Sequence, residues 1–225
     1  MISAVIPAFN EEKTIKETIL ALAATGQIAE IIVVDDGSCD DTAQKALLAG
    51  AFVVSLPQNS GKAKALAVGV RQAKGEILCF VDADLGESAY EFRHLIPPVA
   101  AGKVDMTVAV LPPAQKKGGF GLVKSLAVFG IKSLGGYKAK APLSGQRVLK
   151  RKVWEAAAPA LTGFGVEVGL TVACLRHGFT FQELPVQMYH RETSRDFAGF
   201  CHRGRQFWDL LLTFGNLWLK GRVKT

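Results

Sequence analysis

Two carboxylates separated by one residue, Asp82 and Asp84, directly follow the apolar run 77–81. If that run is an extended strand, alternate side chains point to the same side, so the two carboxylates converge at its end. Hard oxygen ligands of this kind suit Mg²⁺ or Mn²⁺, which complete their shells with water and substrate phosphates. An Asp-X-Asp tripeptide is also common where a strand merely returns to solvent. The rest of the chain must decide between a metal site and an ordinary strand end.

The elements that position this pair alternate between short β-branched runs and segments with helical spacing. We expect strands at residues 3–6, 30–35, 51–56, 77–82, 105–110, 144–149 and 179–189. We expect helices at residues 11–24, 40–49, 61–73, 90–101, 122–134, 166–176 and 199–219. This alternation predicts an α/β fold, a mostly parallel sheet flanked by helices.

Polar clusters follow each of the first four expected strands. They are Pro7–Glu11, Asp35–Ser38, Asn59–Lys62 and Asp82–Asp84. Ligands of open parallel sheets bind outside the carboxyl ends of the strands. Four polar strand ends in succession therefore predict one binding site along that edge of the sheet, which favours the metal interpretation of Asp82 and Asp84.

Length and composition indicate an ordinary globular protein. The chain has 225 residues, of which 49% are hydrophobic, enough for one domain with its own core. Four widely spaced cysteines (Cys39, Cys79, Cys174 and Cys201) form no C-x-x-C pair, which favours free thiols in a reducing compartment. No signal-peptide pattern and no apolar run long enough to span a membrane is visible. We therefore expect a cytoplasmic protein.

The net charge of +7 is unevenly distributed. Residues 112–152 contain ten Lys or Arg and no Asp or Glu, which could form a solvated face or attract phosphates or an anionic membrane. No nucleic-acid-binding signature accompanies the charge, so nucleic acid is not expected as a partner. Residues 199–219 form a strongly apolar helical pattern before a basic tail. Such a helix can dock on the core of the domain or lie at a membrane surface at the inner face.

The polar strand ends occur in an order that resembles a known family. Four segments resemble the nucleotide-sugar-binding half of GT-A glycosyltransferases, in particular glycosyltransferase family 2: "VIPAFNEEKTI", "IIVVDDGSCDDT", "NSGKAKALAVGV" and "ILCFVDADLGES". The resemblance covers about residues 2–90. It implies a single GT-A domain with a donor-binding half (1–111), an acceptor-side half (112–190) and a basic loop with a C-terminal amphipathic helix (191–225). It also implies transfer of a hexose from a UDP- or GDP-linked sugar, with Mn²⁺ or Mg²⁺ as cofactor.

The same resemblance implies roles for individual residues. Asp84 would be the main metal ligand and part of the catalytic centre, with Asp82 touching both metal and ribose. Pro7 and Ala8 would offer backbone contacts to the base, and Asp36 a side-chain contact. The full set of residues implied for nucleotide-sugar binding is Pro7, Ala8, Asn10, Glu11, Asp36, Gly61, Lys62, Asp82 and Ala83.

The second half resembles the family less uniformly. The segment "LSGQRVLKR" looks like an acceptor-side loop, which implies contacts to acceptor or phosphate from Ser144, Gly145, Gln146 and Arg147. Residues 163–178 are similar to a segment of glucosyl-3-phosphoglycerate synthases and polyprenyl-phosphate sugar transferases. Glu167 is the only acid on that apolar stretch, and burying it requires a partner. It is a candidate sugar-binding or general-base residue, or alternatively a first-turn acid favoured by the helix dipole.

The segment after the last expected strand, "YHRETSRD", is similar to a loop that closes over the diphosphate. His190 is a candidate third metal ligand, and Arg191 and Arg195 would clamp phosphate oxygens. The expected acceptor is a phosphorylated small molecule or a lipid phosphate, and a homodimer and a peripheral membrane contact stay open. The alternative is a nucleotidyltransferase-like enzyme or a non-catalytic nucleotide-sugar-binding domain. Nucleotidyltransferases usually carry a Gly-rich first loop, which Pro7–Glu11 is not.

Overall fold

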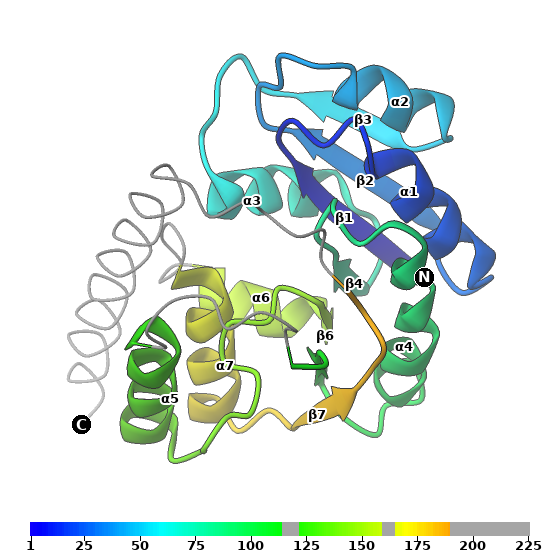
Figure 1. Ribbon diagram of the computed structural model, residues 1–225. Helices are drawn as coiled ribbons and strands as arrows, with labels where there is room; N and C mark the ends of the chain where they lie inside the picture. The colour runs from blue at the N-terminus through cyan, green and yellow to red at the C-terminus, as the bar shows by residue number, and fades with distance from the viewer. Residues whose placement is uncertain (114–121, 159–164, 190–225) are drawn as a thin grey trace.

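The computed structural model describes residues 1–113, 122–158 and 165–189, and their core is one seven-stranded sheet (Figure 1). The strand order is β3-β2-β1-β4-β6-β5-β7. Strand β6 runs antiparallel to both of its neighbours, and every other pair is parallel. The strands are β1 (Ile2–Ala8), β2 (Glu30–Asp35), β3 (Phe52–Ser55), β4 (Ile77–Phe80), β5 (Met106–Val110), β6 (Arg147–Lys150) and β7 (Phe181–Pro185). The predicted mostly parallel sheet is confirmed.

Helices cover both faces of this sheet. One face carries α1 (Ile15–Ala24), α2 (Thr42–Leu48), the short 3₁₀ helix η1 (Gly86–Glu91) and α4 (Phe92–Ala100). The opposite face carries α3 (Lys62–Gln72), α6 (Arg151–Ala157) and α7 (Val166–Arg176), with α5 (Leu122–Gly135) packed outside α7. The doubly covered sheet explains why the inner strands β1, β4 and β5 are largely apolar, because both of their faces are buried.

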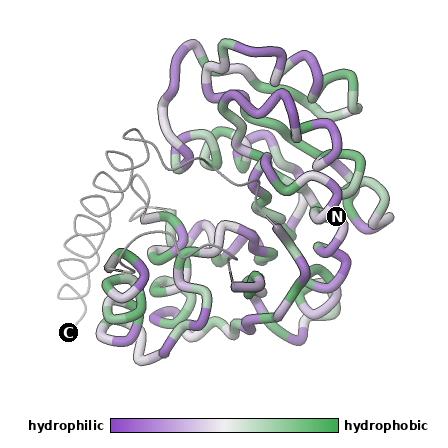
Figure 2. The backbone as a smooth tube through the Cα atoms, viewed as in Figure 1, coloured by the Kyte–Doolittle hydropathy of each residue, from purple (hydrophilic) through white to green (hydrophobic). Residues whose placement is uncertain are grey.

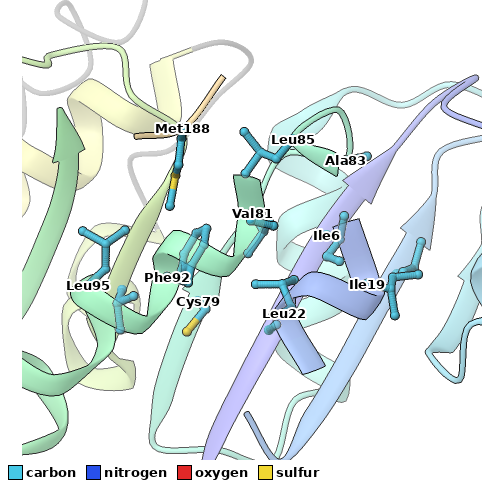
Figure 3. Close-up of a cluster of buried hydrophobic side chains, with 14 of the residues drawn as sticks. Ile6, Ile19, Leu22, Cys79, Val81, Ala83, Leu85, Phe92, Leu95 and Met188 are labelled. Carbon is cyan, nitrogen blue, oxygen red and sulfur yellow. The ribbon is translucent and has the colours of Figure 1, made fainter. Parts of the chain in front are cut away.

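Two hydrophobic clusters, one on each side of the sheet, form the main core. Figure 3 shows the cluster that joins β1, α1 and α4, in which Ile6, Ile19, Leu22, Phe92 and Leu95 form one layer beside the sheet. The second cluster lies between the sheet and helices α3, α6 and α7. Hydrophobic residues follow the central strands, whereas many outer turns are hydrophilic (Figure 2). The core therefore holds the carboxyl ends of the central strands in a fixed arrangement.

Several element bounds differ from the sequence-based expectation, and the differences around β4 and β6 bear on the site. Strand β4 ends at Phe80, so Asp82 and Asp84 lie in the turn that follows it and not on the strand itself. Strand β6 begins only at Arg147, which leaves residues 144–146 as a loop. Helix α6 was not predicted, because its seven residues follow directly from β6 and are too few to show a helical period.

The C-terminal part of the prediction lies outside the described residues. This applies to the basic loop and the amphipathic helix expected within 191–225. Among residues 1–113, 122–158 and 165–189, no helix combines the length and the apolar character that crossing a bilayer requires.

Candidate active site

The candidate site lies where β1, β2 and β4 end and where β6 begins. Because β6 is antiparallel to β4, its first residue pairs with the last residue of β4, Arg147 with Phe80. The loop 144–146 therefore faces the turn that carries Asp82 and Asp84. The reversed strand brings the acceptor-side segment of the sequence against the donor-side carboxylates.

The centre of the site is an ionic cluster formed by Lys62, Asp82 and Glu167. The Nζ atom of Lys62 lies 2.7 Å from Oδ1 of Asp82 and 2.9 Å from Oε1 of Glu167. Burial by itself would lower the pKa of Lys62, but attraction to Asp82 and Glu167 outweighs it and raises that pKa above its usual value. Lys62 is therefore a fixed cation at the start of α3, and it gives the isolated Glu167 of α7 the partner that its burial requires.

A glutamine holds the other side of Asp82. The side-chain nitrogen of Gln146 donates to Oδ2 of Asp82 at 2.6 Å, and its side-chain oxygen accepts from the backbone N–H of Asp82 at 3.0 Å. Gln146 itself is fully buried. The family resemblance implied that Gln146 contacts the acceptor, whereas its side chain turns toward Asp82 in the structure.

Gly145 allows this cluster to close. A Cβ atom at this position would lie 2.5 Å from Nζ of Lys62 and 2.8 Å from Oδ2 of Asp82. Both distances are far shorter than carbon makes with such atoms, so any side chain would displace the ion pair. Glycine at this position thus lets the 144–146 loop approach the Lys62–Asp82 pair without displacing it.

Asp36 fixes the loop that carries Lys62. Its Oδ1 accepts from the backbone N–H of Ser60 and its Oδ2 from that of Gly61, both at 2.8 Å. The Asp36 side chain is buried, and Gly61 has a φ of 89°, which favours glycine. In this structure Asp36 therefore positions the start of α3, and its contact with a nucleotide base stays a prediction. Asp35 holds the preceding turn by accepting from the N–H of Ser38 at 3.1 Å.

The segment after β1 is tied to the segment after β2. Asn10 has a φ of 57°, its side-chain oxygen accepts from the N–H of Cys39 at 2.9 Å, and its own N–H donates to Ser38. The N–H of Glu11 donates to Oγ1 of Thr42 at 2.8 Å. The backbone carbonyl of Ala8, at the end of β1, accepts from the N–H of Asp36 at 2.8 Å. The preceding residue, Pro7, is half-buried. These bonds align two strand-end loops side by side.

Thr18 of α1 holds the turn that carries Asp84, a role that was not predicted from the sequence. Its hydroxyl donates to the carbonyl of Ala83 at 2.9 Å and accepts from the N–H of Gly86 at 2.8 Å. Thr18 is fully buried and so fixes the turn on which Asp84 sits. A lone polar residue on the apolar stripe of α1, between Ile15 and Ile19, was the signal available in the sequence.

Arg147 lies beneath the site and not at its surface. It is 1% exposed, its Nε donates to the carbonyl of Ser144 and its Nη1 donates to Oγ1 of Thr171, each at 2.8 Å. Burial lowers the pKa of Arg147 to about 10. In this conformation the guanidinium offers no solvent-facing surface to an acceptor phosphate. Arg147 instead ties the 144–146 loop to α7, whose Thr171 also donates to the carbonyl of Glu167 at 3.0 Å.

The chemistry of Asp82 and Asp84 fits a hard divalent cation, as both offer carboxylate oxygens beside a strand end. Within the described ranges, no three His, Cys, Asp or Glu side chains come close enough to hold a metal ion by themselves. The predicted third ligand His190 and the predicted phosphate ligands Arg191 and Arg195 lie outside the described residues. Asp82 and Asp84 stay predicted metal ligands, and a substrate diphosphate would complete the shell.

Comparison with known proteins supports the predicted resemblance. The model of glycosyl transferase family 2 matches residues 3–153. The uncharacterized protein MJ1222 of Methanocaldococcus jannaschii is 30% identical over 200 residues, covering 84% of this chain and 82% of that protein. Glucosyl-3-phosphoglycerate synthase of Mycobacterium tuberculosis H37Rv is 30% identical over 209 residues, covering 76% of this chain but 60% of the synthase.

Solved structures show the same fold. A crystal structure of the M. tuberculosis glucosyl-3-phosphoglycerate synthase with Mg²⁺ and UDP superposes with a TM-score of 0.79 at 26% identity, covering 96% of this chain and 79% of that one. A second, with Mn²⁺, UDP and glucosyl-3-phosphoglycerate, gives a TM-score of 0.77 at 27% identity, with the same two coverages. These matches confirm the predicted GT-A fold and the predicted family resemblance.

Proposed function

Because this chain belongs to glycosyl transferase family 2 and is a glycosyltransferase, we propose that it transfers a hexose from a UDP- or GDP-linked sugar to a phosphorylated acceptor, with Mn²⁺ or Mg²⁺ as cofactor. The observation that carries this proposal is the Lys62–Asp82–Glu167 cluster at the carboxyl ends of the strands. The crystallised relatives that hold UDP with Mg²⁺ or Mn²⁺ favour uridine as the base of the donor.

The donor would lie across the ends of β1, β2 and β4. The paired loops after β1 and β2 offer Pro7, Ala8, Asn10, Glu11 and Asp36 to the base and ribose. Lys62 provides a permanent cation next to Asp82. Asp84 and Asp82 would hold the metal ion, which when bound acts as a Lewis acid that neutralises charge on the departing diphosphate. Ala83 stays buried in the turn between these two carboxylates.

Glu167 is our candidate for the residue next to the reacting sugar. It shares Lys62 with Asp82, so its carboxylate faces the same space as the donor-side carboxylate. A carboxylate at this place can accept hydrogen bonds from sugar hydroxyls or take the proton of the acceptor hydroxyl. Its ion pair with Lys62 gives Glu167 a specific partner in the site, which a first-turn helix acid does not need.

The proposed acceptor carries phosphate. One relative is solved with phosphoglyceric acid, and another, 35% identical over 111 residues, is an undecaprenyl-phosphate 4-deoxy-4-formamido-L-arabinose transferase of Pectobacterium carotovorum. Phosphoglyceric acid and undecaprenyl phosphate both carry a phosphate, and the segment 112–152 of this chain has ten cationic residues and no acidic one. Of these ten, Arg147 is buried, and Lys150 and Lys152 each lie 2.9 Å from Asp105, so the support comes from the other cations of the segment. Ser144 and Gly145 would border the acceptor, and Arg191 and Arg195 stay predicted phosphate ligands. We propose a cytoplasmic enzyme, with membrane contact only if the acceptor is a lipid phosphate.

A product-release assay tests the proposal. Purified protein is incubated with UDP-glucose or a GDP-linked hexose and Mn²⁺, and with 3-phosphoglycerate or a short-chain polyprenyl phosphate, and released nucleoside diphosphate is measured by chromatography. We expect acceptor-dependent release that disappears when Mn²⁺ is chelated. Tight Mn²⁺-dependent nucleotide binding without release for any donor and acceptor would instead identify a non-catalytic nucleotide-sugar-binding domain. Release of inorganic pyrophosphate from a nucleoside triphosphate would point to a nucleotidyltransferase.

A further inference from the structure

Gln146 makes a two-point contact with a single residue of the candidate site. Its side-chain nitrogen donates to Oδ2 of Asp82 at 2.6 Å, and its side-chain oxygen accepts from the Asp82 N–H at 3.0 Å. Gln146 is 0% exposed, and its backbone carbonyl accepts from the N–H of Ala109 on β5 at 3.0 Å. The backbone of Gln146 is therefore anchored to β5, while its side-chain amide holds both the backbone N–H and the carboxylate of Asp82.

The two oxygens of the Asp82 carboxylate are held from different sides. Gln146 contacts Oδ2, while the ammonium group of Lys62 lies 2.7 Å from Oδ1. Gly145, with no side chain, lets the loop bring Gln146 this close. Rotation of the carboxylate would break at least one of these bonds. The plane of the carboxylate is thus set before any ligand arrives.

Only an amide side chain satisfies both contacts. Asp82 presents one donor, its N–H, and one acceptor, Oδ2, and glutamine offers the complementary pair. Glutamate at 146 would set one carboxylate against another, and methionine of similar length would leave the N–H and Oδ2 without this partner. A buried donor or acceptor that loses its partner costs about 1–3 kcal/mol.

We propose that Gln146 is a positioning residue that orients the Asp82 carboxylate for the metal-bound diphosphate of the donor. This rests on the proposed function, and it replaces the acceptor-binding role that family resemblance implied for Gln146. The buried side chain does not touch substrate and acts through Asp82. Removal of an outer hydrogen-bond partner of a metal ligand typically lowers metal affinity about 10–100-fold. A loss of this size is expected in the metal-dependent part of donor binding.

The test measures UDP affinity by calorimetry with and without Mn²⁺. The dissociation constant without Mn²⁺ divided by the dissociation constant with Mn²⁺ gives the Mn²⁺ ratio, the factor by which the metal tightens UDP binding. In Gln146→Met we expect this ratio to fall by about tenfold or more, while affinity without metal changes little. The exposed Gln44 of α2 provides the matched control, because Gln44→Met makes the same chemical change at a solvent-exposed position of a helix that packs on the opposite face of the sheet from α3. A purely structural role would lower the melting temperature but leave the ratio of the folded protein unchanged.

A double-mutant cycle shows whether Gln146 acts through Asp82. Asp82→Asn alone should reduce the Mn²⁺ ratio, and adding Gln146→Met should then cost little more. Full additivity of the two losses would overturn the proposal, as would an unchanged ratio in Gln146→Met. If that variant does not fold, Gln146→Asn decides the same question, because it keeps a neutral amide but is one methylene too short to hold both contacts with Asp82. Absence of Mn²⁺-dependent UDP binding in the wild-type protein would overturn the proposed function itself.

Discussion

Replacing Lys62 by methionine should destabilise the protein even when no ligand is present. The substitution keeps most of the length of the side chain but removes the charge that Asp82 and Glu167 share at 2.7 and 2.9 Å. Loss of one partner from a fully buried ion pair costs about 3–5 kcal/mol, whereas exposed pairs contribute about 0–1 kcal/mol. The side chains of Lys62 and Asp82 are 24% exposed and that of Glu167 is 11% exposed. Discounting for this partial exposure, we expect a loss of about 2–3 kcal/mol.

Chemical denaturation at pH 7.5, without nucleotide or metal, measures this loss. Thermal unfolding gives a second measure. In a domain of this size each kcal/mol lowers the melting temperature by about 2–4 °C, so Lys62→Met should melt about 4–12 °C lower than wild type. Lys64 provides the matched control, because it is exposed and lies on the same first turn of α3. Lys64→Met should change the free energy of unfolding by no more than about 0.5 kcal/mol.

The pH dependence has a defined sign. The pKa of Lys62 is raised in the folded protein, so its stabilisation is fully present below its unfolded value of 10.5 and is lost only as pH rises through the higher folded value. The difference between wild type and Lys62→Met at neutral pH is therefore not due to titration of the lysine. Adding Glu167→Gln to Lys62→Met should restore part of the stability, since one uncompensated carboxylate is removed. Equal stability of wild type and Lys62→Met, or equal losses in the Lys62 and Lys64 variants, would refute this reasoning.

Three further substitutions separate the roles within the site. Gly145→Ala introduces a Cβ atom 2.5 Å from Nζ of Lys62, so the Lys62–Asp82 pair must shift. Mn²⁺-dependent UDP binding measured by calorimetry should weaken about tenfold, the lower end of the loss typical when the surroundings of a metal ligand are disturbed, with an unchanged circular dichroism spectrum. Affinity equal to that of wild type would mean that the loop or the two side chains move at little cost. Asp84→Ala should abolish the metal-dependent part of donor binding while the protein stays folded, since the residue lies in a half-buried turn; metal-dependent affinity equal to that of wild type would remove Asp84 from the metal site. Glu167→Gln should lower kcat more than it raises KM for the donor in the product-release assay, and near-normal turnover would show that Glu167 is only a structural partner of Lys62.

Local sequence patterns determined the sheet and the edge at which the site lies. The runs that became β1, β2 and β4 are mostly apolar because helices bury both faces of the sheet there, and this signal is independent of distant residues. The polar residues that follow these strands had to gather at one edge, because parallel strands end on the same side. The exact end of β4 and the short helix α6 escaped prediction, since neither has a local signal strong enough to mark it.

Only the tertiary structure decided which of these polar residues touch each other. Asp82 and Gln146 are 64 positions apart, and they meet because β6 enters the sheet antiparallel beside β4. The sequence indicated that a buried Glu167 needs a partner, but Lys62 became that partner through the packing of α7 against the face that α3 also covers. The sequence likewise showed that Arg147 and Asp36 are charged, but it did not show that both are buried. Their burial makes them supports of the loops around the site. Periodicity is a property of neighbouring residues, but the partner of a buried charge depends on how distant elements pack.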